Sequence, residues 1–171
     1  MHTPCATPPE PLRGGGVALR KWETEDAEWY VSARDSEVYA WTTETPTLTL
    51  EATREAIRRN GLTPLWVGLA VTDAESGALL GNLALRPTGE GPGEGEVSYW
   101  LALEGRGRGA ATEAVRLLVN WAFESGAFRR LILVTKPGNT RSQAVALRAG
   151  FTLEDADAVR CRFSLERSDE P

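Results

Sequence analysis

The sequence contains few of the residues that usually carry metal, redox or nucleophilic chemistry. It has one histidine, two cysteines and one methionine among 171 residues. His2 lies in a stretch rich in proline and glycine, and Cys5 and Cys161 lack the spacing of a metal site or a disulfide framework. We therefore expect no metal site. Cys161 alternates with apolar residues, which predicts a small buried hydrophobe.

The sequence also lacks an apolar run of about 20 residues, the length needed to cross a membrane. The N-terminal stretch has no apolar core of the kind that a signal peptide carries. We expect a cytoplasmic protein with no membrane partner. Its predicted organisation is a disordered leader at 1–16, a single domain at 17–167 and a frayed tail at 168–171.

Charge is unevenly distributed along the chain. The formal net charge of −5 argues against binding to nucleic acid. Between Gly105 and Arg148, however, eight basic residues face only two acidic ones. These arginines could simply lie on solvated helix faces, or they could form a basic half that binds a small polyanion. The glycine-rich loop inside the same span favours the second interpretation.

Hydrophobic periodicity predicts an α/β fold, a mixed and mostly antiparallel central sheet flanked by helices. The expected order is β-α-α-β-β-β-α-β-α-β-β. Strands are predicted at 17–22, 65–71, 79–85, 96–103, 129–135, 151–153 and 159–165. Helices are predicted at 24–35 and 50–60, after the glycine loop up to about 126, and at 139–150. Thr24, Thr49 and Asn139 are the predicted N-caps, and 38–42 is expected to be an aromatic loop.

The most informative stretch is Gly105–Ala114, which joins a predicted strand to a long amphipathic helix. Glycines let backbone N–H groups approach an anion closely, and a helix N-terminus adds a favourable dipole. Arg106 and Arg108 supply positive charge and several donors each. We expect this loop to bind a phosphorylated ligand.

Two common phosphate loops fit this stretch poorly. A nucleotide-triphosphate loop needs Lys and then Ser or Thr after its last glycine, whereas Ala110 follows Gly109. Gly105, Gly107 and Ala110 nearly match a dinucleotide fingerprint, but that motif belongs in the first βα unit. It should also be followed by a strand that ends in a carboxylate, which is missing here.

A third loop fits. The stretch Arg106–Ala111 matches Arg-x-x-Gly-x-Ala, which resembles the pyrophosphate-binding motif of the GNAT superfamily of acyl-CoA-dependent N-acetyltransferases. The resemblance spans about residues 17–166 and implies the GNAT fold. It is closest to the branch that contains ribosomal-protein alanine N-acetyltransferases, and four stretches carry it in order: Glu96–Leu101, Arg106–Ala114, Asn139–Ser142 and Gly150–Phe151.

The resemblance implies that acetyl-CoA is the co-substrate and that an amine attacks its thioester directly, in a ternary complex. Strands 96–103 and 129–135 would splay apart to admit the cofactor arm. Backbone groups near Leu101, Ala102 and Leu103 would pair with the pantetheine, which Asn139 would also contact besides capping its helix. Backbone amides would wrap the pyrophosphate. The residues that this implies for the pyrophosphate are Arg106, Gly107, Arg108, Gly109, Ala110 and Ala111.

The resemblance also suggests catalytic residues. Many GNAT enzymes protonate the leaving thiolate with a tyrosine whose place is taken by Ala146 here. The ribosomal-protein branch has a serine at Ser142, which would act as a hydrogen-bond donor or proton relay, or would merely support the helix cap. Glu96 is the candidate base, because it alternates with Ser98 and Trp100 on the strand that would line the cleft. Burial would raise its pKa, whereas a strand-end Glu would simply be solvated.

The chain departs from the family pattern at two positions of the cleft strand. Ser98 stands where glycine is usual, and Leu103 stands where proline is usual. Both departures leave the geometry of the strand open.

The first third of the chain is rich in aromatic and acidic residues, and in this fold it would cover the acceptor cleft. We expect Trp41, Tyr39 and Ser98 to bind the acceptor, an amine on a protein N-terminus or on a small cationic molecule. The acids could instead stabilise helix N-termini. A non-catalytic acyl-CoA-binding module is the alternative function, and monomer and homodimer both remain open. The residues in question are Trp22, Trp29, Tyr30, Tyr39 and Trp41 with Glu23, Glu25, Asp26, Glu28 and Glu44.

Overall fold

One eight-stranded sheet organises the molecule, for which a computed structural model describes residues 7–60 and 66–168. The strand order is β1-β2-β3-β4-β5-β6-β8-β7, and only the β5–β6 pair is parallel. The predicted mixed, mostly antiparallel sheet is therefore confirmed. The strands are β1 (Leu12–Gly14), β2 (Val17–Lys21), β3 (Val67–Asp73), β4 (Leu79–Pro87), β5 (Glu94–Leu101), β6 (Arg130–Thr135), β7 (Thr152–Ala156) and β8 (Cys161–Glu166).

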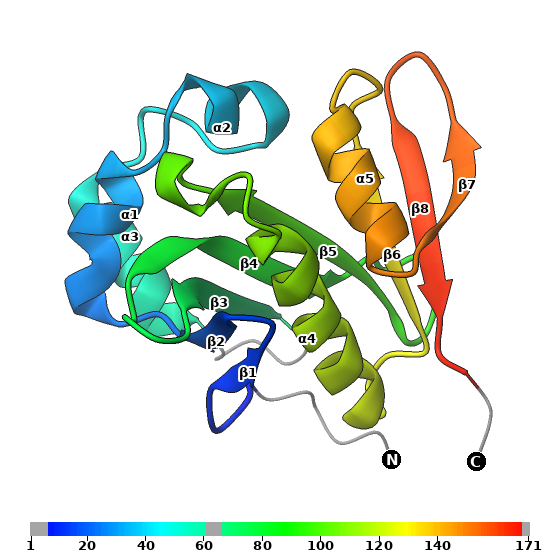
Figure 1. The fold of residues 1–171 in the computed structure, drawn as a ribbon, viewed down its shortest axis with the longest axis horizontal. Helices are drawn as coiled ribbons and strands as arrows, with labels where there is room; N and C mark the ends of the chain where they lie inside the picture. Colours follow the sequence, from blue (N-terminus) through cyan, green and yellow to red (C-terminus); the bar gives the residue numbers. More distant parts are fainter. Residues whose placement is uncertain (1–6, 61–65, 169–171) are drawn as a thin grey trace.

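Helices lie on both sides of this sheet (Figure 1). Helix α4 crosses the face of the central strands, and α5 packs against β6 and β7. Helices α1 and α3 pack against each other, and α2 lies beside the end of β5. The helices are α1 (Ala27–Ser32), α2 (Ser36–Trp41), α3 (Leu50–Arg59), α4 (Ala110–Glu124) and α5 (Thr140–Arg148), with short 3-10 turns η1 (Thr24–Asp26) and η2 (Leu103–Gly105).

The main core lies between α4 and the sheet. The apolar residues of α4 recur at helical spacing and are buried, which fixes the face that the helix turns toward the strands. On β6, Leu131, Ile132 and Leu133 are all buried, as expected for a strand covered on both faces. Each such side chain contributes roughly 1.5–3 kcal/mol by leaving water. Cys161 is buried in the same core, which confirms its predicted role.

Helix termini follow the predicted caps at two of three places. Thr49 accepts a hydrogen bond from the amide of Ala52 at 3.2 Å, and Asn139 accepts one from Ser142 at 3.2 Å. Thr24 does not cap the first helix. Glu23 occupies that position in a reciprocal capping box with Asp26, and the expected helix at 24–35 is divided into η1 and α1.

Two other predictions were wrong in part. The segment Leu12–Gly14, inside the expected leader, forms β1 because it pairs antiparallel with β2. The expected aromatic loop at 38–42 belongs to α2, because the side chain of Asp35 caps a new helix by accepting from the amide of Val38 at 3.1 Å. Leu65 and Gly61, the expected start of one strand and end of one helix, lie outside the described residues.

Candidate active site

The parallel strands β5 and β6 pair over only a short length and then separate. Their register pairs run from Glu94 with Arg130 to Glu96 with Ile132, although β5 continues to Leu101 and β6 to Thr135. The predicted splay is thus present in the structure. Beyond the last pair, backbone groups on the facing edges of the two strands have no partner across the gap.

A cavity of about 1720 Å³ occupies this gap and reaches both faces of the sheet. One side of it is formed by β5, the glycine loop and the start of α5, and the other side by α2, α3 and the opposite face of β4 and β5. A volume of this size exceeds that of a pocket for one small ligand, which suits two substrates meeting in one space. The two sides are described in turn.

The register of β5 is regular despite the departure at Ser98. Each residue from Gly95 to Leu101 pairs with one residue of β4, without a shift. Ser98 is exposed and lines the cavity on the same strand face as Glu96 and Trp100, as predicted. Leu103 is 69% exposed in the 3-10 turn that follows, and it also lines the cavity.

The glycine loop begins where this turn ends. Gly105 passes so close to β4 that a Cβ there would lie 2.8 Å from the carbonyl oxygen of Leu80. Gly107 and Gly109 have φ angles of 73° and 77°, in the left-handed region that favours glycine, with no atom close to where a Cβ would be. Gly109 is the N-cap of α4. The loop therefore leads directly into α4, and the space next to Gly107 and Gly109 is open.

Backbone amides in this loop are available to a ligand. Within the described part of the chain, the N–H groups of residues 107–112 have no hydrogen-bond acceptor, whereas Arg106 and Glu113 on either side do. Gly107, Gly109, Ala110 and Ala111 line the cavity. Unpaired amides at a helix N-terminus can bind an anion, and phosphate binding by this loop stays a prediction.

The arginine side chains of the loop contact carboxylates in the structure. Arg106 donates to both carboxylate oxygens of Asp35 at 2.8 Å and to Glu37 at 3.1 Å. Its Nε donates to the carbonyl oxygen of Leu101 at 3.0 Å. Arg106 therefore ties the loop to α2, and its charge is already matched by carboxylates. Arg108 does not line the cavity and pairs with Asp73 at 2.5 Å. The binding of a pyrophosphate by Arg106 and Arg108 stays a prediction.

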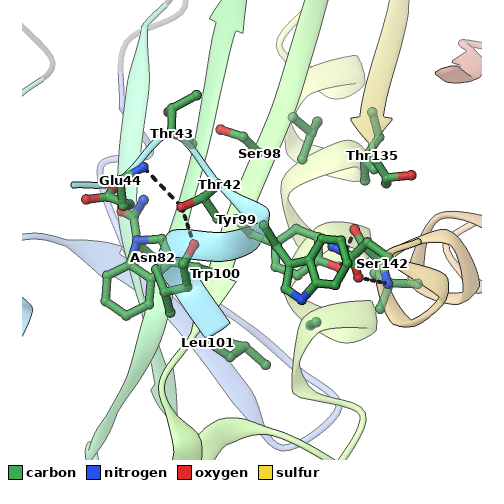
Figure 2. A pocket seen from close by; sticks show the side chains of 18 of the residues that line it. Thr42, Thr43, Glu44, Asn82, Ser98, Tyr99, Trp100, Leu101, Thr135 and Ser142 are labelled. Atoms are coloured by element: carbon green, nitrogen blue, oxygen red, sulfur yellow. Dashed lines mark hydrogen bonds between the residues drawn. The ribbon is translucent and has the colours of Figure 1, made fainter. Parts of the chain in front are cut away.

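Ser142 faces the cavity from the first turn of α5. Its backbone N–H is capped by Asn139, and its hydroxyl accepts a hydrogen bond from the hydroxyl of Tyr99 at 3.0 Å (Figure 2). Tyr99 lies on β5 and Ser142 on α5, the helix that follows β6, so this hydrogen bond connects the two sides of the gap between β5 and β6. Burial raises the pKa of Tyr99, which keeps its proton in place as the donor. Ala146, one turn further along α5, is fully buried.

Tyr99 was not singled out by sequence reasoning. Its alternation with Val97 and Leu101 marks it as a residue of the core-facing side of β5, and it does pack against the main core. Val97 and Leu101, its neighbours on this face of β5, are purely apolar. The hydroxyl of Tyr99 is the one polar group among the three, and it was the signal that could have marked Tyr99 as a site residue. Thr135, at the end of β6, is a second such residue. It is buried and lines the cavity, and its Oγ1 has no hydrogen-bond partner in the described structure.

Glu96 lies at the point where β5 and β6 begin to separate. Its side chain is 23% exposed and lines the cavity, and its carboxylate accepts from Arg86 at 3.0 Å. The carboxylate is thus neither enclosed by apolar groups nor free in solvent. It lies on the side of β5 that faces α2 and α3, with one guanidinium partner.

Aromatic residues line the side of the cavity formed by α2 and α3, but they are not the full predicted set. Trp22, Tyr30 and Trp41 line the cavity and are joined there by Trp66, which is 53% exposed. Trp41 also reaches across to the turn before α5, where a Cβ on Gly138 would lie 3.3 Å from its ring. Tyr39, predicted to bind the acceptor, is not among the cavity-lining residues.

Tyr39 is displaced from the cavity because α2 is a helix instead of the expected loop. The helix turns the Tyr39 ring toward the guanidinium of Arg34, which lies 5.8 Å from the ring centre. Trp29 likewise stacks on Trp100, with ring centres 6.0 Å apart, and does not line the cavity. The Trp29 ring thus supports the cavity-lining Trp100 from behind.

The acids of the first third are mostly engaged elsewhere. Asp26 pairs with Arg20 at 2.7 Å and belongs to the capping box of η1. Of the five predicted acids, only Glu44 lines the cavity. Its carboxylate accepts from the hydroxyl of Tyr30 at 2.7 Å and from the buried guanidinium of Arg34 at 2.8 Å. Burial, followed by the charge of Glu44, raises the pKa of Tyr30.

Two searches of the described residues found nothing further. No helix in residues 7–60 and 66–168 is long and apolar enough to cross a membrane. In the same ranges, no group of three or more His, Cys, Asp or Glu side chains is placed to hold a metal ion.

A sheet that opens between two parallel strands, with a glycine loop leading into a helix at the opening, is the architecture of an acyl-CoA-binding transferase domain. The chain belongs to the acetyltransferase (GNAT) domain family, whose model matches residues 17–152. The resemblance inferred from four short motifs is therefore confirmed.

Individual relatives agree with this assignment. YdaF of Bacillus subtilis, whose name proposes a ribosomal N-acetyltransferase, is 37% identical over 75 residues, which cover 44% of this chain and 41% of that protein. The ribosomal-protein-serine acetyltransferase of Escherichia coli is 37% identical over 56 residues, 33% of this chain and 31% of that one. The matches thus span less than half of these relatives.

A solved structure shows the same fold over almost the whole chain. The crystal structure of spermidine N-acetyltransferase from Vibrio cholerae, in complex with CoA and spermine, superposes with a TM-score of 0.77 at 16% identity, covering 90% of this chain and 96% of that one.

Proposed function

We propose that this protein transfers the acetyl group of acetyl-CoA to a primary amine at the N-terminus of a protein. The observation that carries the proposal is one continuous cavity. It joins unpaired loop amides, a gap between parallel strands and a carboxylate beside an aromatic wall. The family, and relatives whose names refer to ribosomal proteins, support the same activity.

The residues present fit acetyl-CoA as the co-substrate. Amides from Gly107 to Ala111 would bind the pyrophosphate, and the open space above Gly107 and Gly109 leaves room for it. The edges of β5 and β6 that face the gap, together with the buried hydroxyl of Thr135, would meet the polar groups of a pantetheine arm that passes near Leu101, Ala102 and Leu103. Acetyl-CoA would supply an activated thioester, and the protein would orient it.

Two side chains would manage the protons. Glu96 would accept the proton that the acceptor ammonium must lose before it attacks, directly or through water. Ser142 would donate a hydrogen bond to the departing sulfur, since its own hydroxyl hydrogen has no acceptor in the described structure. Asn139 would hold Ser142 in place through the cap of α5.

The charge of the acceptor side favours a peptide N-terminus over a polyamine. Each carboxylate that lines the cavity is already paired with arginine: Glu37 with Arg106 and Arg141, Glu44 with Arg34, and Glu96 with Arg86. A polycation would therefore find little unmatched negative charge. The exposed faces of Trp41 and Trp66 instead offer apolar surface to the residues that follow an N-terminal amine. A cytoplasmic location stays a prediction.

The test is release of thiol from acetyl-CoA in the presence of a panel of amines. The panel contains short peptides with free N-termini, the same peptides with blocked N-termini, spermidine and an amino sugar. We expect turnover with free N-terminal peptides and at least roughly tenfold lower kcat/KM with spermidine. CoA binding without thiol release from any amine would favour the alternative, a non-catalytic acyl-CoA-binding module.

A further inference from the structure

The hydrogen bond between Tyr99 and Ser142 joins two parts of the site that are distant in the sequence. Tyr99 lies on β5 and Ser142 on α5, 43 residues apart in sequence, and both side chains line the cavity. The cavity-lining carboxylates Glu37, Glu44 and Glu96, by contrast, pair with charged arginines. Here two neutral hydroxyls meet at 3.0 Å.

The direction of this hydrogen bond decides what Ser142 can do. A serine hydroxyl has one hydrogen to donate and can accept through its oxygen. Because the Tyr99 hydroxyl donates to Ser142 Oγ, the single hydrogen of Ser142 remains for another acceptor. In the described residues, no hydrogen bond uses it. Donation from Tyr99 also polarises the Ser142 hydroxyl and makes it a better donor.

The rest of the surroundings hold this arrangement. Burial raises the pKa of Tyr99, so the phenol keeps its proton. The backbone N–H of Ser142 is fixed by Asn139 at 3.2 Å, which restrains where its side chain starts. Ala146, on the same face of α5 one turn later, is fully buried and brings no competing polar group.

We propose that Tyr99 is a positioning residue for the reaction: it orients and polarises the Ser142 hydroxyl so that its hydrogen points to the sulfur of the bound thioester. This inference rests on the proposed function. As the amine nitrogen bonds to the acetyl carbon, the C–S bond breaks and its electron pair goes to sulfur. The Ser142 hydrogen bond stabilises this thiolate. The thiolate then takes a proton from solvent, while the proton of the amine goes to the base.

The first experiment compares kcat and KM for Tyr99→Phe, Ser142→Ala and the double variant, with acetyl-CoA and an N-terminal peptide. Tyr99→Phe removes only the hydroxyl. We expect its kcat to fall roughly tenfold, with KM for acetyl-CoA within about twofold of the parent value. Ser142→Ala should lose more, roughly 100-fold in kcat. Because Tyr99 acts through Ser142, the double variant should be no slower than Ser142→Ala alone.

The second experiment needs no acceptor. The ionisation of the thiol of bound CoA is followed by its ultraviolet thiolate absorption as pH is raised. A hydrogen bond to the sulfur favours the thiolate, so Tyr99→Phe and Ser142→Ala should each move the midpoint to higher pH, by about one unit. Ser164→Ala, on β8 and outside the cavity lining, serves as the control and should leave the midpoint unchanged.

The outcomes separate the two proposals. A parent protein that transfers acetyl groups, with a Tyr99→Phe variant of equal kcat and an unmoved thiol midpoint, overturns the positioning role alone. Multiplied losses in the double variant also overturn it, because they mean that Tyr99 acts independently of Ser142. A parent protein that binds no CoA overturns the proposed function, and the positioning role with it.

Discussion

Arg106 and Asp35 form a two-point ion pair that connects the glycine loop to the N-cap of α2. Both contacts measure 2.8 Å, and they hold together residues 71 positions apart. The same Asp35 carboxylate caps α2 through the amide of Val38. One carboxylate therefore fixes both the start of an acceptor-side helix and the turn that leads into the anion cradle.

This pair makes folding stability depend on pH. The hydrogen bonds from Arg106 hold the pKa of Asp35 at about 2, below its usual value. A depressed pKa contributes stability that is complete above about pH 4 and is lost as pH falls toward 2. Because the Asp35 side chain is 40% exposed, solvent screens the pair, and we expect about 1 kcal/mol. Asp35→Asn keeps a good N-cap and removes the charge.

Urea unfolding of Asp35→Asn should therefore show a deficit of about 1 kcal/mol at pH 7 that shrinks as pH approaches 2. Glu124→Gln, an exposed acid near the other end of α4, is the control and should show no pH-dependent deficit. A deficit of the same size at both pH values would mean that the charge of Asp35 is not its cause.

Substitutions of two glycines at opposite ends of α4 distinguish an effect on backbone strain from an effect on ligand binding. Gly109 and Gly126 have φ angles of 77° and 72°, and neither has an atom within 4 Å of a built Cβ. Alanine at either position should cost about 1 kcal/mol of unfolding free energy. Only Gly109→Ala should also weaken acetyl-CoA binding, roughly tenfold by calorimetry, because only Gly109 lies in the cradle. Equal binding by the two variants would place the phosphate elsewhere.

Glu96→Gln tests the candidate base. The substitution keeps the shape of the side chain and removes its ability to take a proton, so kcat should fall roughly 100-fold while KM for acetyl-CoA stays the same. Glu94→Gln is a matched control on the same strand. Its carboxylate is held by Arg130 and Arg162 and does not line the cavity, so its kcat should stay near that of the parent. An unimpaired Glu96→Gln would leave proton removal to water.

Arg130 joins the strands on the far side of the gap. Its guanidinium contacts Glu94 of β5, Glu154 of β7 and Glu166 of β8. A network of this kind stabilises more than isolated surface pairs do, so Arg130→Met should lower the unfolding free energy by about 1–2 kcal/mol. Arg58→Met breaks two exposed pairs, with Glu55 at 3.1 Å and with Glu51 at 3.8 Å, and should cost less than about 0.5 kcal/mol. Denaturant titrations in low and high salt measure both, and high salt should reduce the larger loss.

Local signals in the sequence predicted most of the fold. Apolar periodicity identified α4 and β6, and the caps at Thr49 and Asn139 marked two helix starts, because both depend on residues a few positions apart. Helix α2 was missed because six residues carry too little periodicity, and because Asp35 was read as the end of the preceding helix. The capping role of Asp35 depends on a change of chain direction at this residue, which the sequence pattern did not indicate.

The site was predictable to a different degree. The glycine loop is a local motif, and the structure leaves its amides unpaired as expected. The partners of Arg106 and of Ser142 come from 71 and 43 residues away, and no spacing rule links them. Sequence alone therefore could not show that Asp35 and Glu37 contact Arg106, and it passed over Tyr99 as an ordinary core residue.

The short pairing of β5 with β6 divides the sheet into two parts. Within the described residues, three register pairs are the whole of the strand pairing between the sheet of β1–β5 and the smaller group of β6, β8 and β7. A bound pantetheine arm would act as a surrogate strand that completes the interrupted ladder. The two parts of the sheet would then unfold together, as one cooperative unit. We therefore expect the amides of β6 and β8 to exchange with deuterium more slowly in the liganded protein.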